Sequence, residues 1–301
     1  MHPFGGDITD RDVQGRHLAN GFRLSRVGVT GVKKPVTVRR GNRNTVVNTT
    51  IDVFVDLPST QKGSHLSRNL EVVSEVVDDS VREPVHGLEV LGANICRALL
   101  EKHEYASYSE VHVSGDYFTE RTGPEGRKTL EHYRLLAKAS SRRGDGIKKL
   151  IGVEVIGMTA CPCAMETVKY RYPEFLPEEG GDGPVISHNQ RNVASLMMEV
   201  PEEYDVEAND LIDLVEECFS SPTYEILKRN EEALVVLQSH RNPKFVEDVV
   251  REILARVLES YTELPDEVMV TVKSESEESI HKHNAMAERV TTLGELRSGV
   301  R

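Results

Sequence analysis

The sequence predicts an α+β protein made of two similar modules, each an antiparallel sheet with helices on one face. Three observations lead to this prediction: windows with apolar residues at every second position, windows with apolar residues at every third or fourth position, and the return of this order in the second half of the chain. The 301 residues are enough for two domains of ordinary size. We therefore expect two ββααββ-like modules in one chain.

The first module opens with two strands, because its early windows are β-like and I-D-V-F-V-D-L places apolar side chains on one face. Two amphipathic helices follow, in which apolar residues step by three and four positions. Two further alternating windows flank R-T-G-P-E-G, which is typical of a hairpin turn. The expected elements are strands 26–38 and 51–57, helices 66–77 and 88–99, and hairpin strands 108–118 and 130–140.

The second module repeats this order with less regular helices. Asp205 is a candidate N-cap for the first of them, and Asn242 with Pro243 forms a candidate cap and first turn for the last. The buried stripe of that last helix includes Phe245, Val249 and Ile253. The expected elements are strands 150–159 and 192–200, a helix 206–219, a helical or irregular segment 224–238, a helix after 243, and a strand around 268–272, with a surface excursion at 171–187.

The charge of the chain argues against one class of function. Lys and Arg number 37 against 49 Asp and Glu, and the net charge of −12 has the wrong sign for a general nucleic-acid binder. Residues 1–48 are locally basic, which suits either a small anion such as a nucleotide triphosphate or a solvent-facing tail. No window is apolar enough to span a membrane, and the start lacks the pattern of a secretory signal, so we expect a cytoplasmic location.

The four cysteines fall into two groups. Four are too few for a disulfide scaffold in a chain of 301 residues. Cys96 and Cys218 lie within apolar helical patterns and are expected to be core thiols. Cys161 and Cys163 follow a strand end in T-A-C-P-C-A-M-E, which in a reducing compartment favours metal binding or catalysis. Pro162 favours a turn, in which one thiolate ligates a metal and the other stays free.

Three more segments carry polar side chains that do not fit a core stripe: S-H-N-Q-R at 187–191, N-E-E at 230–232 followed by Glu247, and E-S-I-H-K-H-N-A at 278–285. Taken singly, a histidine is more often a core or surface residue, and Glu247 also suits an exposed helix face. His281 and His283, two residues apart just after what we expect to be the last strand, point the same way and suit metal or proton-transfer work. Together these segments match the ligand set of a catalytic transition-metal site with a position open for water.

Six ordered motifs resemble those of the type IB GTP cyclohydrolase family over about residues 22–292. They are V-G-V-T-G-V at 27–32, K-G-S-H-L-S-R at 62–68, T-A-C-P-C at 159–163, S-H-N-Q-R at 187–191, N-P-K-F-V-E-D at 242–248 and E-S-I-H-K-H-N-A at 278–285. The resemblance implies a tandem tunnelling fold and a homo-oligomer, a dimer or tetramer, with active sites at subunit interfaces. The corresponding divisions are an N-terminal tail 1–21, modules 22–145 and 146–292, and a C-terminal tail 293–301.

The resemblance also implies roles for individual residues. Cys161, His188 and Glu232 are expected to be metal ligands, although Cys163 could replace Cys161. Cys161, Cys163, His281 and His283 are expected to be catalytic. Glu247 is expected to anchor guanine, since a carboxylate matches its N1 and 2-amino donors. The residues expected to approach the rest of the substrate are Lys62, His65 and Arg68, with Lys62 or Arg68 facing phosphate.

The implied reaction is metal-assisted hydrolysis at guanine C8 of GTP with release of formate. The metal is expected to be Fe(II), with manganese or zinc as alternatives. The long excursion after C-P-C favours the archaeal methanopterin-pathway subgroup, whose product is 7,8-dihydroneopterin 2′,3′-cyclic phosphate plus pyrophosphate. Three alternatives remain open: the bacterial product dihydroneopterin triphosphate for folate biosynthesis, a relative of the nitrile reductase of queuosine synthesis, and a non-enzymatic metal-binding scaffold. No nucleic acid or membrane partner is expected.

Overall fold

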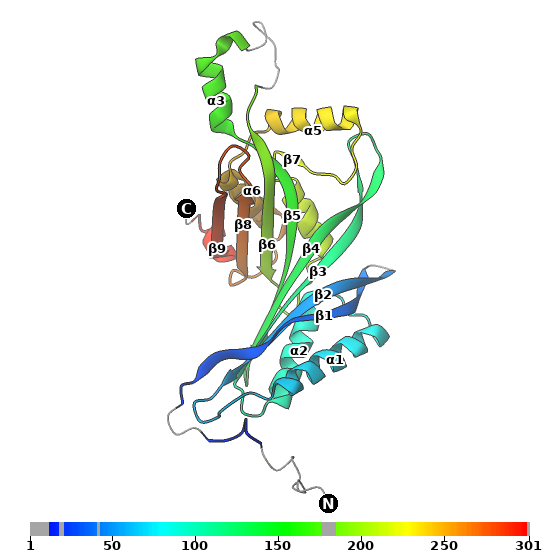
Figure 1. Ribbon diagram of the computed structural model, residues 1–301, viewed down its shortest axis with the longest axis vertical. Helices are drawn as coiled ribbons and strands as arrows, with labels where there is room; N and C mark the ends of the chain where they lie inside the picture. Colours follow the sequence, from blue (N-terminus) through cyan, green and yellow to red (C-terminus); the bar gives the residue numbers. More distant parts are fainter. Residues whose placement is uncertain (1–11, 18–20, 41–42, 176–184, 300–301) are drawn as a thin grey trace, which may run out of the picture. The chain divides into compact units, whose positions relative to one another are not determined.

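The computed structural model describes residues 12–17, 21–40, 43–175 and 185–299 (Figure 1). It confirms the α+β class. The elements are β1 (Leu24–Arg40), β2 (Arg43–Leu57), α1 (Leu66–Arg82), α2 (Leu88–Lys102), β3 (Tyr108–Thr122), β4 (Lys128–Arg142), β5 (Ile147–Ala160), α3 (Pro162–Arg171), a 3₁₀ turn η2 (Pro173–Phe175), β6 (Asn189–Glu199), α4 (Ala208–Glu216), β7 (Ser221–Pro222), α5 (Arg229–Arg241), α6 (Val246–Ser260), β8 (Met269–Ser276), β9 (Ala285–Thr292) and α7 (Leu293–Arg297).

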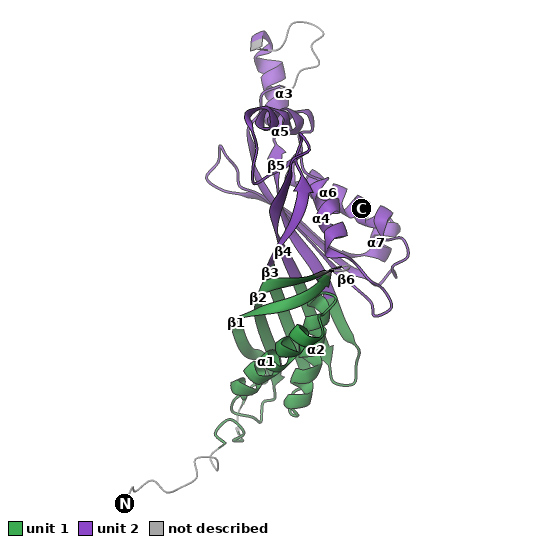
Figure 2. Ribbon diagram, turned by 90° about the vertical axis from the view of Figure 1, so that its right-hand side faces the viewer, with its two compact units in different colours: residues 1–115, 137–149 green, residues 116–136, 150–301 purple. Residues whose placement is uncertain are grey.

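The strands pair in the order β1-β2-β3-β4-β5-β6-β8-β9, and β7 pairs with β5. The β1–β2, β5–β6, β6–β8 and β8–β9 pairs are antiparallel. The chain divides into two compact units that interleave in sequence (Figure 2), because the tip of the β3–β4 hairpin belongs to the second unit. The module boundary predicted between residues 145 and 146 rests on the order of the elements along the chain. It stays a prediction.

The first unit comprises residues 1–115 and 137–149. Alternate strand side chains point towards α1 and α2, which pack on each other and on one face of the strands (Figure 1). The expected helices and strands of the first half are confirmed. Its fully buried apolar side chains include Val36, Val38, Val53, Val55 and Val111 from the strands and Val73, Leu91, Ile95 and Leu99 from the helices.

The second unit comprises residues 116–136 and 150–301. Here α4 and α6 pack on each other and on β6, and α6 also packs on β8 and β9. Its fully buried apolar side chains include Val153, Val155, Leu196, Met198, Leu211, Ile212, Val249, Ile253, Val257, Val270 and Val272. No helix among the described residues is long and apolar enough to cross a membrane.

Two helix starts were predicted wrongly. The helix expected from 206 begins at Ala208 after the extended residue Glu207, because Val206 is buried in the core before the helix starts, so Asp205 is not the cap. Asn242 ends α5 as its C-cap instead of starting α6. The α6 helix begins after Phe245, whose backbone N–H donates to the Asp248 carboxylate (3.0 Å).

Three other expectations need correction. Phe245 precedes the helix and is 43% exposed, so it is not part of the buried stripe. C-P-C does not form an isolated turn, because Pro162 begins α3 with Cys161 as N-cap. The segment with His281 and His283 does not follow the last strand, since β9 comes after it with only weak alternation of burial. Of the expected excursion at 171–187, residues 176–184 lie outside the described part of the chain.

The predicted core thiols are confirmed. Cys96 and Cys218 are both fully buried and free of disulfides. Burial raises the pKa of each thiol to about 12, because a thiolate would lose its hydration there. Neither is therefore a candidate nucleophile or metal ligand in the resting protein.

The Asp56 carboxylate fastens the end of β2 to the start of β3 in the first unit. It is 4% exposed. It accepts hydrogen bonds from the backbone N–H groups of Ser107 and Tyr108 (both 2.8 Å), from the Ser107 hydroxyl and from Arg23 (both 2.7 Å). Burial by itself would raise the pKa of Asp56, but the bonds from Ser107, Arg23 and Tyr108 outweigh it and hold the pKa below the ordinary value of an aspartate.

Replacing Asp56 by Asn should lower the free energy of unfolding by roughly 1–3 kcal/mol at neutral pH, because an amide cannot accept all four bonds. A lowered native pKa stabilises the fold above the ordinary aspartate pKa, and this advantage is lost as pH falls through the native value. Urea unfolding at pH 7 and in acid should therefore show the two proteins converging at low pH. An equal change in Asp78→Asn, an exposed position on α1, would contradict this role for Asp56.

Candidate metal and substrate site

The β5–β6 pair brings two of the predicted segments together. Ala160 at the end of β5 pairs with Asn189 at the start of β6. The next residue, Cys161, donates its backbone N–H to the His188 carbonyl (3.0 Å), and its own carbonyl accepts from the Ser187 hydroxyl (2.5 Å). Cys161 and His188 are therefore fixed side by side although 26 residues separate them.

The two thiols of C-P-C have different surroundings. Cys161 is half-buried at the N-terminus of α3, and its sulfur accepts the Ala164 N–H (3.4 Å). Cys163 lies one residue into the helix and is exposed. Of the two, Cys161 lies beside His188, which favours it as the ligand and leaves Cys163 free.

The His188 ring is held by a network of buried polar side chains. Its Nδ1 lies 2.8 Å from Oε1 of Gln190, whose amide donates towards Thr159 (3.3 Å) and Glu278 (3.4 Å). A carboxylate only accepts at neutral pH, so the Gln190 amide nitrogen must face Glu278 and its oxygen must face His188. His188 then donates from Nδ1, which leaves the Nε2 lone pair available to a metal.

The network continues into the core. Thr159 contacts the Ser276 hydroxyl (3.1 Å), Asn192 donates to Ser276 (2.7 Å), and Ser274 donates to Asn192 (2.9 Å). These side chains are fully or almost fully buried. Buried polar groups cost free energy unless they are bonded, so a satisfied chain here holds the Gln190 amide in one orientation.

Glu278 is a further candidate site residue, which the sequence alone did not single out. Its carboxylate lies 3.6 Å from Nδ1 of His188, and both side chains are only slightly exposed (12% and 11%). It belongs to the E-S-I-H segment, of which only the histidines were predicted as site residues. A carboxylate three residues before His281 was the available clue.

His281 and His283 lie on the β8–β9 loop next to His188. Their rings stack with centroids 5.1 Å apart, and the His281 ring meets the His188 ring edge-on at 6.4 Å. Both are exposed. The predicted same-side arrangement of this pair is confirmed, and the His281 ring lies against that of His188, just before the start of β6.

Glu232 is not brought into this cluster. It is exposed near the start of α5, whereas His240 near the end of that helix contacts the Ser187 carbonyl (3.1 Å). They are eight positions apart, about 12 Å along the helix axis. Among the residues that the structure describes, no group of three or more His, Cys, Asp or Glu side chains is close enough to hold a metal. Glu232 as a ligand stays a prediction.

Glu247 is exposed in the first turn of α6 and lines a groove of about 800 Å³. The groove is lined by apolar side chains and by charged side chains of both signs. Its other lining residues are Val250, Arg251, Leu254, Ala287, Glu288, Arg289, Leu296 and Gly299. Exposure alone fits an ordinary helical Glu, but a groove beside the carboxylate also leaves room for a planar ligand.

A buried lysine fastens the start of α6 to the end of β5. The Lys244 backbone N–H donates to the Ala160 carbonyl (3.0 Å), and its ammonium donates to Glu252 (2.5 Å) and the Cys218 carbonyl (3.0 Å). Lys244 is 9% exposed. The N-P-K-F motif therefore has a structural reason for its lysine, and it ties the helix that carries Glu247 to the strand that ends beside the cysteines.

Lys62, His65 and Arg68 lie in the first unit, on the loop before α1 and in its first turn. The loop is held by the segment 12–17, because Lys62 and Gly63 donate backbone N–H groups to the Arg16 and Gln14 carbonyls (both 3.1 Å). The three predicted residues are thus grouped with one another.

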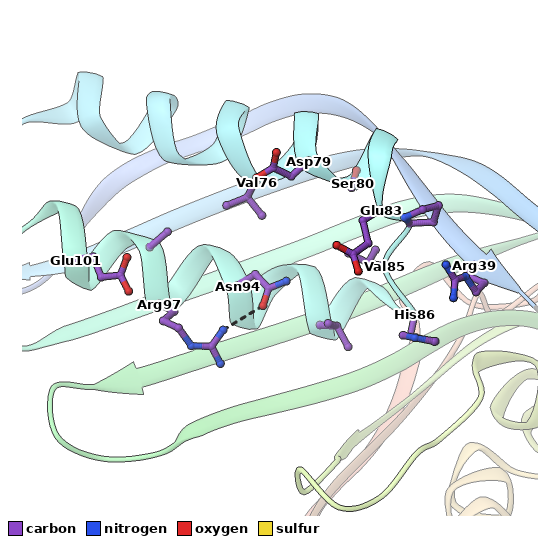
Figure 3. Close-up of a pocket in the computed structure, with 13 residues that line it drawn as sticks. Arg39, Val76, Asp79, Ser80, Glu83, Val85, His86, Asn94, Arg97 and Glu101 are labelled. Carbon is purple, nitrogen blue, oxygen red and sulfur yellow. Dashed lines mark hydrogen bonds between the residues drawn. The ribbon is translucent and has the colours of Figure 1, made fainter.

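The first unit also contains a cavity, of about 530 Å³, and none of the predicted site residues lines it (Figure 3). It lies between α1 and α2, its lining includes Arg39, Arg97, Asp79, Glu83 and Glu101, and Arg97 donates to Asn94 (3.1 Å). Because both charge signs line it, the cavity favours no single class of ligand.

Comparison with known proteins agrees with the motifs. A family model described as type I GTP cyclohydrolase folE2 matches residues 11–287. The GTP cyclohydrolase MptA of Methanosphaera stadtmanae is 44% identical, with 95% of this chain and 96% of the relative covered. Proteins of the same name from Methanothermobacter thermautotrophicus (44%; 95% and 94% covered) and Methanosarcina acetivorans (42%; 96% and 96%) are similarly close.

Solved structures add information on the fold alone. Uricase from Arthrobacter globiformis has a TM-score of 0.52 at 9% identity, with 91% of this chain and 94% of that chain covered. A hyperthermostable variant of an AgUricase scores 0.55 at 10% identity, with 89% and 92% covered. The family match over nearly the whole chain, together with relatives 42–44% identical, shows that this protein belongs to the type I GTP cyclohydrolase family of enzymes.

Proposed function

We propose that this protein is a metal-dependent GTP cyclohydrolase of the methanopterin pathway. It hydrolyses guanine C8 of GTP, releases formate, and yields 7,8-dihydroneopterin 2′,3′-cyclic phosphate plus pyrophosphate. The observation that carries the proposal is the cluster of Cys161, His188, Glu278 and His281 at the paired ends of β5 and β6. The name shared by the archaeal relatives supports the choice of pathway and product.

The donor types at this cluster suit a divalent metal, although the described side chains do not come close enough together to hold one as they lie. Thiolate, imidazole and carboxylate are ligands of Fe(II), which we propose as the native metal, and also of zinc and manganese. Cys161 and the free Nε2 of His188 would hold it, with a carboxylate from Glu232 or Glu278. When bound, the metal supplies Lewis-acid activation of water at neutral pH.

The remaining residues bind the substrate and move protons. His281 and His283 are placed to carry a proton towards N7 as the imidazole ring opens, with Cys163 as a free thiol nearby. Glu247 would accept from the guanine N1 and 2-amino groups. Lys62, His65 and Arg68 would meet the triphosphate, and their positive charge would stabilise departing pyrophosphate.

We also propose that the fold is a tandem tunnelling fold that assembles as a homo-oligomer with interfacial active sites. The element order β1-β2-α1-α2-β3-β4 in the first half and the likeness to uricases support this reading of the fold. Two edge strands, β1 and β9, are available for pairing with other copies. The cytoplasmic location stays a prediction.

Replacing Cys161, His188 or Glu232 by Ala should strip the metal without unfolding the protein, because an open catalytic site contributes less to folding than a structural metal does. Elemental analysis and circular dichroism measure the two effects. Cys163→Ala serves as the control and should keep the metal. Glu278→Gln tests whether the second carboxylate helps to hold the metal. Full metal occupancy in all three Ala variants would contradict the proposed ligand set.

Glu247→Gln should keep the metal and the fold but weaken GTP binding at least tenfold, about 1.4 kcal/mol, because the amide turns one acceptor into a donor that faces a donor. Calorimetric titration with GTP measures the dissociation constant. Glu259→Gln, an exposed position near the other end of α6, is the matched control. A constant within threefold of the wild-type value would make Glu247 an ordinary surface residue.

The product decides the subgroup. Incubation of anaerobically purified protein with Fe(II) and GTP should release formate and pyrophosphate in equal amounts, and mass spectrometry should show a cyclic monophosphate of dihydroneopterin. Dihydroneopterin triphosphate without pyrophosphate would replace this product by the bacterial one. Absence of formate would argue for a non-enzymatic scaffold.

A further inference from the structure

A chain of hydrogen bonds runs through the first unit beneath the K-G-S-H-L-S-R loop. The Ser64 hydroxyl contacts the Tyr105 hydroxyl (2.8 Å), which contacts Nδ1 of His103 (2.9 Å), and Nε2 of His103 contacts Oδ1 of Asn69 (2.6 Å). Asn69 and His103 are fully buried, and Ser64 is 8% exposed. None of these residues belongs to the predicted metal or guanine site.

The direction of this chain follows from the state of His103. Burial lowers the pKa of His103 to about 4, and the nearby charge of Arg68 adds to the effect, so the ring is neutral at pH 7. A neutral ring has one donor and one acceptor nitrogen. With the Asn69 oxygen facing Nε2, His103 donates to Asn69 and accepts from Tyr105, which accepts from Ser64 in turn.

Two buried polar atoms at the far end of the chain lack a hydrogen-bond partner among the described residues: Nδ2 of Asn69 and Nδ1 of His65. The two residues are one helical turn apart, at the start of α1, where side chains four positions apart are neighbours. Asn69 Nδ2 is a donor. The other ring nitrogen of His65, Nε2, faces the Asp12 carboxylate (3.1 Å), so it carries the proton and leaves Nδ1 as an acceptor.

The two unpartnered atoms are therefore complementary, since one is a donor and the other an acceptor. They are not within hydrogen-bond distance of each other, and a buried water that joins such a pair is a common solution. We propose that Asn69 is a positioning residue that sets the tautomer of His65 through one bound water, so that the ring presents Nε2–H to an anionic oxygen. Asp12 provides such an oxygen from this chain, and a phosphate oxygen has the same chemistry.

The tautomer is measurable independently of enzyme activity. In protein labelled with ¹⁵N-histidine, the His65 signal is identified by its loss in His65→Gln, and its two-bond ¹H–¹⁵N pattern reports the tautomer. The wild-type ring should be Nε2–H, and it should stay so in Asp12→Ala. In Asn69→Leu the Nδ1–H form should rise to a third or more of the population, and Tyr105→Phe, which keeps the aromatic ring, should act in the same direction.

Ser80→Ala is the matched control, because Ser80 is another buried polar residue of α1 whose hydroxyl donates to the Val77 carbonyl in its own helix (2.6 Å). It should leave the His65 tautomer unchanged. The proposal is overturned if folded Asn69→Leu and Tyr105→Phe both keep the wild-type tautomer, or if the tautomer follows Asp12 alone.

A contact between His65 and a phosphate of GTP rests on the proposed function, and a separate measurement tests it. If His65 meets the triphosphate, Asn69→Leu should raise KM for GTP at least fivefold with kcat within twofold of wild type, while Ser80→Ala changes neither. A tautomer that depends on Asn69 together with an unchanged KM would leave the positioning role intact and remove His65 from the substrate site.

Discussion

The antiparallel register of β5 and β6 is the constraint on which the candidate site depends. It places the end of one strand beside the start of the next, so that Cys161 and His188 share a backbone hydrogen bond. A shift by one residue would turn every side chain of β6 to the opposite face and move Gln190 away from Thr159. Buried apolar residues on alternate positions of both strands oppose such a shift.

Polar side chains in the core connect this register to the orientation of the His188 ring. Thr159, Asn192 and Ser276 are fully or almost fully buried, and each is bonded to another member of the network. Unbonded, each would cost roughly 1–3 kcal/mol, so the network is a rigid support for Gln190 and through it for His188. The preference for one tautomer at His188 is then a consequence of packing around the strands.

The same physical principle recurs in the first unit with different residues. There a buried neutral histidine, His103, orients an amide and a hydroxyl below the loop that carries Lys62 and His65. His188 and His65, whose side chains are 11% and 18% exposed, each lie next to such a network of buried side chains. In neither network could the hydrogen bonds reverse their direction without leaving a donor facing a donor.

The motifs and the periodicity of the sequence determined much of this protein. Alternation in I-D-V-F-V-D-L and the stripes of α1 and α2 predicted the first half, because burial there follows local pattern. The motif order predicted the family. The segments C-P-C and S-H-N-Q-R and the His pair predicted most residues of the cluster around His188.

Only the tertiary structure decided the helix starts and the neighbours of each site residue. Asn242 and Asp205 have good capping chemistry, but the Lys244–Ala160 bond and the burial of Val206 keep the backbone extended past them. Glu278 joined His188, and Glu232 did not, because their positions depend on the β8–β9 loop and on α5, which pack through contacts distant in sequence. Local pattern records which face of an element is buried, whereas distances between elements are set by packing across the core.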